Sequence, residues 1–496
     1  MQTESQKLPV ESQKLSVVEK VGYGLGDASA NLIFQVMMIL QMIFYTDAFG
    51  ITPLAAGILL GVARIWDGIF DPVMGLIADR TNTRWGKFRP WILWTAIPFG
   101  VMAFLCFYTP KFSNVGKLLY AYITYIGFMT IYSMNNLPYS ALSGVATSDI
   151  GDRTSLSSYR QTCAMLAGVV VQGLAMPLVA HFGKRLDGTV DKALGYKWTI
   201  GIFSIIGIFL FFITFITTKE RIKPDPKQKT SVGQDFADLL KNGPWIILFL
   251  LTIFIFITLA MRGGDIAYLF TYYFDKGAEL AVLQSSRLLS VLQFLHIVSA
   301  EPNETDIISW SFSVFSVSGL IATILGIISS KWFAIRMGKR NAFILGLATI
   351  TILWVPFYFL TPTAVWPAII LQLFAQFGYG ITAPLLWAMM ADVADYSEWM
   401  TGRRATAIVF AAVVFGLKAG IGVGGAIGGW ILGHYGYMAN VAQSERALIG
   451  IRLTASIFPA IPFGIGVILL LLYKINKPME LQMQNELTER RKQYKY

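Results

Sequence analysis

Charged residues are scarce in this sequence. Asp, Glu, Lys and Arg make up only 14% of its 496 residues, whereas soluble domains carry about 25%. The two cysteines, Cys106 and Cys163, lie within apolar runs, which excludes a disulfide-stapled scaffold. The three histidines, His181, His296 and His434, are too scattered for the spacing of a zinc site. Soluble, disulfide-rich and zinc-dependent classes of protein are therefore not expected.

Apolar residues are abundant instead and fall into long runs. They amount to 55% of the chain, in runs of about 20 residues, which is enough for a helix to cross a bilayer. The polar N-terminus has no apolar core of a cleavable signal peptide, so we expect the first spanning helix to direct membrane insertion. The runs predict an all-α membrane protein with twelve transmembrane helices, near residues 21–47, 53–79, 90–109, 117–143, 157–181, 196–217, 245–275, 308–330, 341–360, 366–391, 404–434 and 447–475.

The charges lie mainly between these runs. A polar segment separates the first six helices from the last six, and Pro224 and Pro226 disfavour a continuous helix there. Lys and Arg concentrate in segments that this assignment places in the cytoplasm, so both termini are expected there, and the net charge of +11 implies no nucleic-acid partner. We predict an N-terminal half at 1–217, a cytoplasmic linker at 218–244, a C-terminal half at 245–475 and a cytoplasmic tail at 476–496.

One further segment, 279–299, is apolar enough to be considered as a thirteenth helix. That assignment would move the basic cluster at 331–340 outside, against the positive-inside rule. We therefore predict either an amphipathic segment at the membrane surface or an extension of helix seven.

A short internal repeat supports two related halves. The sequence RWGK at 84–87 follows the second predicted helix, and RMGK at 336–339 follows the eighth. Parallel repeats of six helices about an axis normal to the membrane are typical of the major facilitator fold. Together with the basic linker, the repeat predicts that fold, with two six-helix halves.

The second predicted helix carries three charges within its apolar run. Arg64, Asp67 and Asp71 are spaced by three and four residues, which places them on one face. Intramembrane charges are costly and usually functional. Two carboxylates one turn apart repel each other, so one takes up a proton or both share a cation. The alternative is a structural ion pair between Arg64 and Asp67.

Several other polar residues interrupt predicted helices. Lys418 lies among glycines in helix eleven and requires a buried carboxylate, which helix two supplies. Arg160 in helix five has a planar guanidinium that suits sugar hydroxyls or a carboxylate. Asn31 and Asn136 bind ligand or link helices. We predict that these four residues contribute to a substrate site.

Charged residues also lie at the end of helix ten. Asp392 and Asp395 are followed by Arg403 and Arg404 at the start of helix eleven. We interpret them as charge pairs that lock the cytoplasmic side and break when it opens, with a solvated loop as the alternative.

At these residues the sequence resembles the glycoside–pentoside–hexuronide cation symporters of the major facilitator superfamily, which include the melibiose and glucuronide permeases. The most specific stretches are ARIWDGIFDP at 63–72, NTRWGKFRP at 82–90 and ADVADY at 391–396. The resemblance implies that Asp67, Asp71 and Ser133 bind the coupling cation. It also matches Lys418 and Arg160 to the family's helix-eleven lysine and sugar-contacting arginine.

The departures from the family pattern concern the ligands. Asn31 and Asn136 replace two carboxylates that grip galactosides, which favours an anionic or uronic-acid substrate. Phe70 replaces an amide of the sodium-using relative, so H⁺ is preferred over Na⁺ as the coupling ion. No other cofactor or metal is expected.

The sequence therefore predicts a monomeric symporter in a bacterial cytoplasmic membrane. It would import a glycoside, pentoside or uronide together with a cation by alternating access between the two halves. A passive sugar facilitator or exchanger without ion coupling is the alternative. An enzyme is not expected, because Asp67 and Asp71 lie within a helix and face no second acidic motif.

Overall fold

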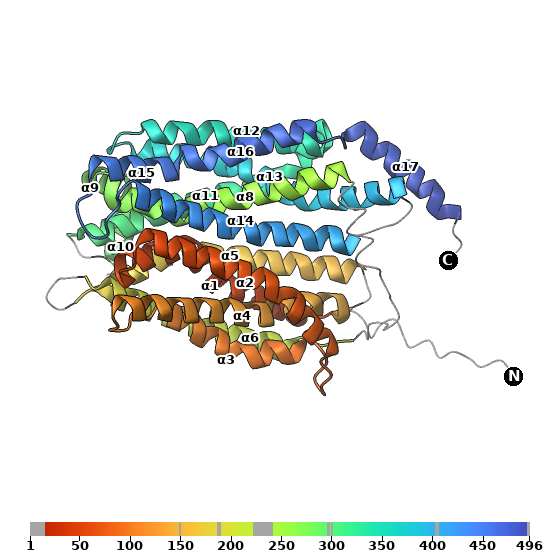
Figure 1. The fold of residues 1–496 in the computed structure, drawn as a ribbon, viewed down its shortest axis with the longest axis horizontal. Helices are drawn as coiled ribbons and strands as arrows, with labels where there is room; N and C mark the ends of the chain where they lie inside the picture. The colour runs from red at the N-terminus through yellow and green to blue at the C-terminus, as the bar shows by residue number, and fades with distance from the viewer. Residues whose placement is uncertain are drawn as a thin grey trace.

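The computed structural model describes residues 15–147, 150–185, 190–221, 242–294, 298, 301–401 and 406–493. Within these ranges all the regular elements are helices, apart from two isolated β-bridges. Most of the long helices run side by side along the longest axis of the molecule (Figure 1). The described residues thus form an all-helical bundle, as the apolar runs predict.

The elements before residue 221 form one group. α1 passes into a π-helical segment, η2, and α4 and α5 are the longest members. Their bounds are α1 Val17–Ile43, η2 Phe44–Phe49, α2 Pro53–Arg80, α3 Arg89–Cys106, α4 Asn114–Ala146, α5 Ile150–Gly183 and α6 Lys192–Thr217.

The elements after residue 242 form a second group that is interrupted more often. The predicted helices at 341–360 and 447–475 are each divided: the first ends in a 3-10 turn, and the second breaks at Ser456. The bounds are α8 Gly243–Tyr268, η3 Leu269–Tyr273, α9 Lys276–Ser285, α10 Leu288–Phe294, α11 Glu304–Met337, α12 Lys339–Trp354, η4 Val355–Phe359, α13 Val365–Thr401, α14 Thr406–His434, α15 Glu445–Ala455, α16 Ile457–Leu472 and α17 Lys477–Gln493.

Eleven helical segments of the described chain are long and apolar enough to cross a membrane. Of the twelve predicted helices, α4 is the one missing from this set, although it has 33 residues and packs between α2 and α3. Its sequence is rich in Tyr, Ser, Gly and Asn, which lowers its hydropathy. Two of its polar residues make buried hydrogen bonds to other helices: Ser133 donates to Asp67, and Asn135 donates to Thr95.

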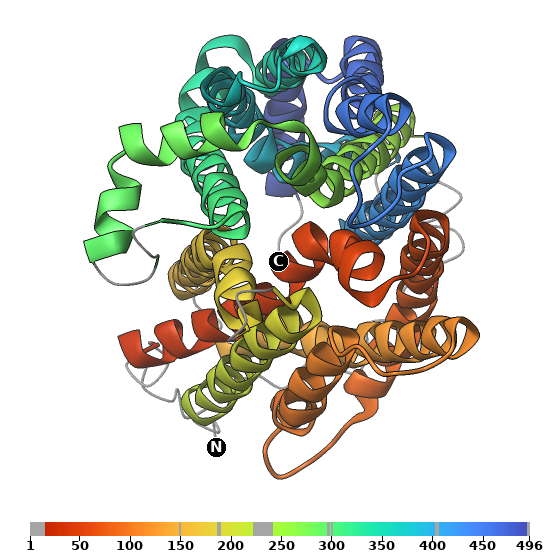
Figure 2. The same cartoon turned by 90° about the vertical axis from the view of Figure 1, so that its left-hand side faces the viewer.

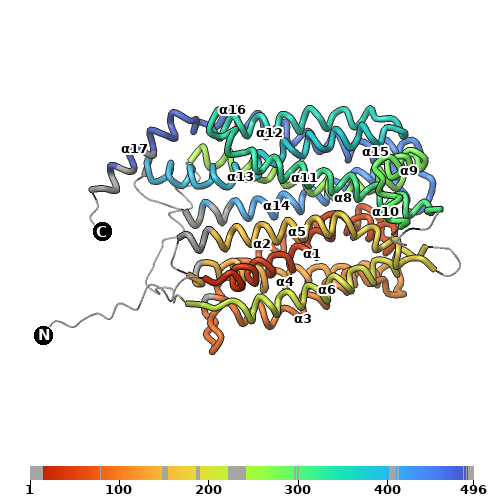
Figure 3. Tube along the Cα trace, turned by 180° about the vertical axis from the view of Figure 1, so that it is seen from behind, coloured from red at the N-terminus to blue at the C-terminus, as the bar shows by residue number. Residues whose placement is uncertain are grey.

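The segment at 279–299 does not form a spanning helix. It begins within α9 and continues as α10, and these two helices have only ten and seven residues. The chain turns between them at Arg287, whose φ is 58°. Both helices lie at the end of the bundle opposite α17 (Figure 3). The prediction that no thirteenth helix forms here agrees with the structure.

The repeated RxGK sequences both have a glycine with positive φ between two helices, although 84–87 lie in a loop and Arg336, Met337 and Lys339 are helical. Gly86 has φ 110° and Gly338 has φ 83°, values that favour glycine. A new helix begins three residues after Gly86 and one residue after Gly338. A Cβ atom on Gly86 would lie 2.4 Å from the Glu220 carboxyl carbon. Glu220 in turn accepts hydrogen bonds from the backbone N–H groups of Lys87, Phe88 and Arg89 at 2.7–2.9 Å. This explains why the loop sequence requires glycine.

Seen end-on, the helices from the two parts of the chain gather on opposite sides of the molecule (Figure 2). α2 packs against α14, α5 against α11 and α1 against α8 across the boundary between them. The candidate site lies along the first of these contacts.

Candidate functional site

Two carboxylates on α2 share one hydroxyl group on α4. Ser133 Oγ lies 2.6 Å from Asp67 Oδ1 and 2.7 Å from Asp71 Oδ1. Asp67 and Ser133 are at most 1% exposed. The structure therefore brings together the three residues predicted to bind the cation.

Lys418 on α14 closes this site from the other helix group. Its Nζ lies 3.0 Å from Asp67 Oδ2 and also forms a short ion pair with Asp71 Oδ2. The lysine is surrounded by apolar turns, so its charge is balanced by these carboxylates rather than by solvent. The predicted contact between helix two and helix eleven is present in the structure.

Arg64 has weaker contacts than Lys418. Its Nη1 lies 3.9 Å from Asp67 Oδ2, its Nη2 lies 3.9 Å from Met38 Sδ, and its guanidinium carbon lies 5.3 Å from the Phe34 ring centroid. The alternative predicted for Arg64, an ion pair with Asp67, is thus present, at a longer distance than the contacts of Lys418. The cluster thus contains two basic side chains, Arg64 and Lys418, and two carboxyl groups.

Small residues allow α2 and α14 to approach this closely. A Cβ atom on Gly422 of α14 would lie 2.7 Å from the Cβ of Arg64. Glycine at such a position lets two membrane helices pack backbone to backbone. The close approach is what lets Lys418 reach the carboxylates of α2.

A cavity of about 350 Å³ lies between the two helix groups. Its walls come from α1 and α5 on one side and from α8, α11, α12 and α13 on the other. Aromatic faces and amide groups suit a sugar ring and its hydroxyls. The polar and aromatic residues that line it are Asn31, Phe34, Gln35, Gln172, Arg262, Phe312, Phe315, Ser316, Thr323, Trp354, Gln372, Gln376 and Tyr379.

The four predicted substrate residues do not gather in this cavity. Only Asn31 lines it, and its amide also donates to the Asp27 carbonyl at 2.9 Å. Lys418 lies in the carboxylate cluster, and Asn136 is half-buried in α4 outside the cavity lining. Their proposed contacts with substrate stay predictions.

Arg160 has a partner that the sequence reasoning did not identify. Its Nε lies 3.2 Å from Asp27 Oδ2, and its guanidinium carbon lies 5.4 Å from the ring centroid of Tyr139. Tyr139 stacks on Tyr23 with ring centroids 4.7 Å apart. The charge of Arg160 is therefore balanced within the protein. The sequence did mark Asp27 as unusual, because it is a charged residue within the first apolar run.

Arg262 on α8 was also missed, although it too interrupts an apolar run. It is 4% exposed and lines the sugar-sized cavity. Its Nη2 donates to Gln372 Oε1 at 2.9 Å, and its guanidinium carbon lies 4.3 Å from the Trp354 ring centroid. Arg262 thus places a charged donor in the wall of the cavity.

A polar network joins the two groups at the end of the bundle where α9 lies. Asp47, in η2, accepts short hydrogen bonds from Tyr272 and Tyr437, and its backbone carbonyl accepts one from Asn440 Nδ2 at 2.6 Å. Lys192 Nζ lies 3.5 Å from Asp47 Oδ2. These contacts hold the two groups together at this end of the molecule.

Another contact between the two groups at the same end is an ion pair. Lys184, directly after the end of α5, has its Nζ 2.7 Å from Asp306 Oδ2 on α11. Near α17, two ion pairs between described residues each lie within one group: Arg221 pairs with Glu19, and Lys339 pairs with Asp392.

The predicted cytoplasmic charge pairs are only partly described. Asp392 pairs with Lys339 at 2.7 Å, and Lys339 also lies 2.8 Å from Glu480 of α17. Asp395 has interactions of its own. Arg403 and Arg404 lie outside the described residues, so their role as partners stays a prediction.

The carboxylate cluster, the cavity between two helix groups and the helical bundle define a membrane transporter. The chain belongs to the MFS/sugar transport protein family, whose model matches residues 22–300 and 309–477. It is accordingly a sugar transporter and not an enzyme, and it is a multi-pass membrane protein.

Characterised relatives and solved structures agree with this assignment. The chain is 36% identical to the inner membrane symporter YicJ of Escherichia coli (strain K12), over 86% of this chain and 85% of that protein. It is 33% identical to the isoprimeverose transporter of Lactiplantibacillus pentosus, over 96% and 92% of the two chains. The crystal structure of a D-xylose-proton symporter shares the fold, with a TM-score of 0.56 and 14% identity over 94% of this chain and 97% of that one.

Proposed function

We propose that the protein is a cation-coupled symporter that imports a glycoside, pentoside or uronide across a bacterial inner membrane. The observation that carries this proposal is the pair Asp67 and Asp71, which share Ser133 and are bridged to the other helix group by Lys418. A cation that binds the carboxylates competes with Lys418, and its binding is therefore linked to the contact between α2 and α14. The names of the relatives, a symporter and an isoprimeverose transporter, support the same function.

The proposed coupling ion is H⁺. A serine hydroxyl has one hydrogen to donate, yet Ser133 Oγ lies within hydrogen-bonding distance of both carboxylates. A proton on one carboxyl group supplies the missing donor. A metal cation such as Na⁺ would need several oxygen ligands, and the position of Phe70 on α2 offers none.

The sugar is proposed to bind in the 350 Å³ cavity, where Asn31, Gln372 and Trp354 come from different helix groups. In this account α4 is the twelfth spanning helix, and α1–α6 and α8–α16 form the two six-helix halves. Both termini lie in the cytoplasm, and residues 218–244 link the halves. Rocking of one half against the other exposes the cavity alternately to the two sides.

The polar network around Asp47 is proposed to be the closed external gate. It holds η2 against Tyr272 and Tyr437 on the side opposite α17. Outward opening must break these bonds. The charges at Asp392, Asp395, Arg403 and Arg404 are proposed to close the cytoplasmic side in the alternate state.

The proposed function is tested with the purified protein in lipid vesicles. An inwardly directed pH gradient or Na⁺ gradient is imposed, and the uptake of labelled isoprimeverose, xylosides and glucuronides is measured. We expect uphill accumulation of at least one sugar with the pH gradient. If the sugar only equilibrates across the membrane and neither gradient makes it accumulate, the protein is a passive facilitator instead. Accumulation that depends on Na⁺ at constant pH would contradict H⁺ coupling.

A further inference from the structure

Asp265 on α8 is a buried carboxyl group that neither the cation site nor the sugar cavity uses. It is 2% exposed, and its Oδ2 is sealed from solvent without a hydrogen-bond partner in the described part of the chain. An ionised carboxylate in such surroundings is costly unless a cation compensates it. In this conformation the stable form of Asp265 is therefore the protonated one.

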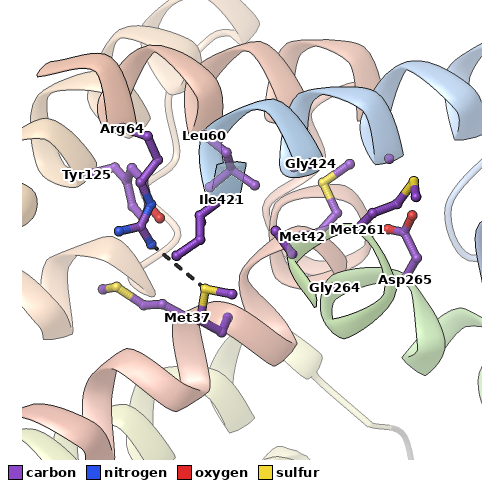
Figure 4. Close-up of a pocket in the computed structure, with 14 residues that line it drawn as sticks. Met37, Met42, Leu60, Arg64, Tyr125, Met261, Gly264, Asp265, Ile421 and Gly424 are labelled. Atoms are coloured by element: carbon purple, nitrogen blue, oxygen red, sulfur yellow. Dashed lines mark hydrogen bonds between the residues drawn. The ribbon is translucent and has the colours of Figure 1, made fainter. Parts of the chain in front are cut away.

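The side chain lines a small cavity between the helices. Its volume is about 30 Å³, which is enough for roughly one water molecule. Figure 4 shows Asp265 and Arg64 at opposite ends of this cavity, with apolar side chains between them. Gly428 makes room for the carboxyl group, because a Cβ atom there would lie 2.7 Å from Asp265 Oδ2.

The charged and titratable neighbours of Asp265 are few. Arg64 on α2 and Tyr125 on α4 line the same cavity, while α1 and α14 contribute methionine, isoleucine and glycine to it. Tyr268, three residues later on α8, also interacts electrostatically with Asp265. The other elements that pack on α8, namely η3, α13, α15 and α16, contribute no lining residue. Arg262, one turn earlier on α8, faces the sugar-sized cavity instead. Arg64 is thus the cation among the residues that line the cavity of Asp265.

Arg64 also belongs to the cation site, but loosely. Its closest approach to Asp67 is 3.9 Å, and its other contacts are the sulfur of Met38 and the ring of Phe34. Arg64 is therefore only loosely held by Asp67 on its own helix, and it lines the same cavity as Asp265.

We propose that Asp265 is a second proton-binding site of the transporter, linked through Arg64 to the cation site at Asp67 and Asp71. One proton binds one carboxylate oxygen, and no other bond changes. When Asp265 is ionised, it draws Arg64 away from Asp67 and weakens the balance of charge in the cation site. When it is protonated, Arg64 returns to Asp67. By reciprocity, proton binding at Asp265 changes the cation affinity, and cation binding changes the proton affinity of Asp265.

This inference rests on the proposed function for its place in the transport cycle, but its first test needs no substrate. The full-length protein in phosphatidylcholine vesicles is titrated while infrared difference spectra are recorded. We expect a protonated-carboxyl band that is lost on titration and is missing from Asp265→Asn. Asp306→Asn, which alters an ion pair at the outer end of α11, is the matched control and should keep the band.

The linkage is tested in the same vesicles. Asp71→Asn should shift the pH midpoint of the Asp265 band by about one unit, the shift expected for a typical coupling energy. Gly428→Ala crowds Asp265 Oδ2 and should therefore also move the band. This variant replaces Asp265→Asn as the test if Asp265→Asn does not fold. A band that does not titrate from about pH 5 to about pH 9, or one that Asp71→Asn leaves in place, would overturn the proposal. A titrating band in vesicles that accumulate no sugar would instead contradict the proposed function alone.

Discussion

Lys418 on α14 lies 3.0 Å from Asp67 on α2, and this ion pair joins the helix group before residue 221 to the group after residue 242. Both residues are largely withdrawn from solvent, with side-chain exposures of 14% and 0%. The pair therefore links the charge state of the carboxylates to the packing of α2 against α14. Such a link is what ion-driven rearrangement of two halves requires.

Lys418→Ala should destabilise the protein, because it leaves two carboxylates buried without their cation. Removal of one partner of a buried pair costs about 3–5 kcal/mol. Thermal unfolding in detergent measures the loss. The double variant Lys418→Ala with Asp71→Asn should recover much of it, and a double variant no more stable than the single one would show that the pair is unimportant for stability.

Ser133→Ala should weaken cation binding, because it removes the hydroxyl that both carboxylates contact. A hydrogen bond to a charged group contributes about 1.5–3 kcal/mol, which corresponds to a loss of roughly tenfold or more in affinity. The pH dependence of sugar counterflow measures it. Ser143→Ala is the matched control, because the Ser143 hydroxyl donates to the Ser140 carbonyl on the same helix. Equal effects of the two variants would speak against a role for Ser133.

Tyr272→Phe combined with Tyr437→Phe should open the outer end of the molecule. The two hydroxyl groups donate to Asp47, and their loss leaves a buried carboxylate with fewer donors. In a background without Cys106 and Cys163, a cysteine introduced in place of Gln35 reports on access to the cavity. Its labelling by an impermeant thiol reagent from outside should become severalfold faster.

Tyr435→Phe is the control for this experiment, because the Tyr435 ring packs on Gly450 outside the Asp47 network. An unchanged labelling rate in the double variant would mean that the Asp47 network is not the gate.

Glu279 on α9 should make stability depend on pH. Burial raises the pKa of its carboxyl group to about 7 from 4.5, against the opposing charge of Lys276. A raised pKa in the folded state means that stability is full below pH 4.5 and falls as the pH rises towards 7. Glu279→Gln should therefore raise the free energy of unfolding at pH 8 by up to about 3 kcal/mol, seen as a higher unfolding temperature. At pH 4 it should change the stability little. Glu304→Gln, an exposed site, is the control, and a gain that is equal at both pH values would contradict the account.

Much of the cation site could be predicted from the sequence. Helical spacing alone places Asp67 and Asp71 on one face, and a lone lysine amid glycines requires a buried carboxylate. The glycines of the RxGK sequences likewise indicate two backbone positions with positive φ between helices.

Other features depended on tertiary contacts that no local pattern reveals. A charge within an apolar run marks Asp27 as unusual, but its pairing with Arg160, like that of Asp392 with Lys339, joins residues far apart in the sequence. The break at Ser456 lies within a segment that is long and apolar enough for one spanning helix, so hydropathy could not reveal it. The walls of the sugar-sized cavity come from six helices, and only their packing shows which faces meet there.

The most direct test of the central claim is sugar uptake by Asp71→Asn in lipid vesicles. The account holds that a cation bound at Asp67 and Asp71 drives sugar uphill. With an imposed pH gradient, this variant should therefore lose accumulation while it still exchanges internal for external sugar without a gradient. Uphill accumulation at the wild-type level in Asp71→Asn would contradict the account.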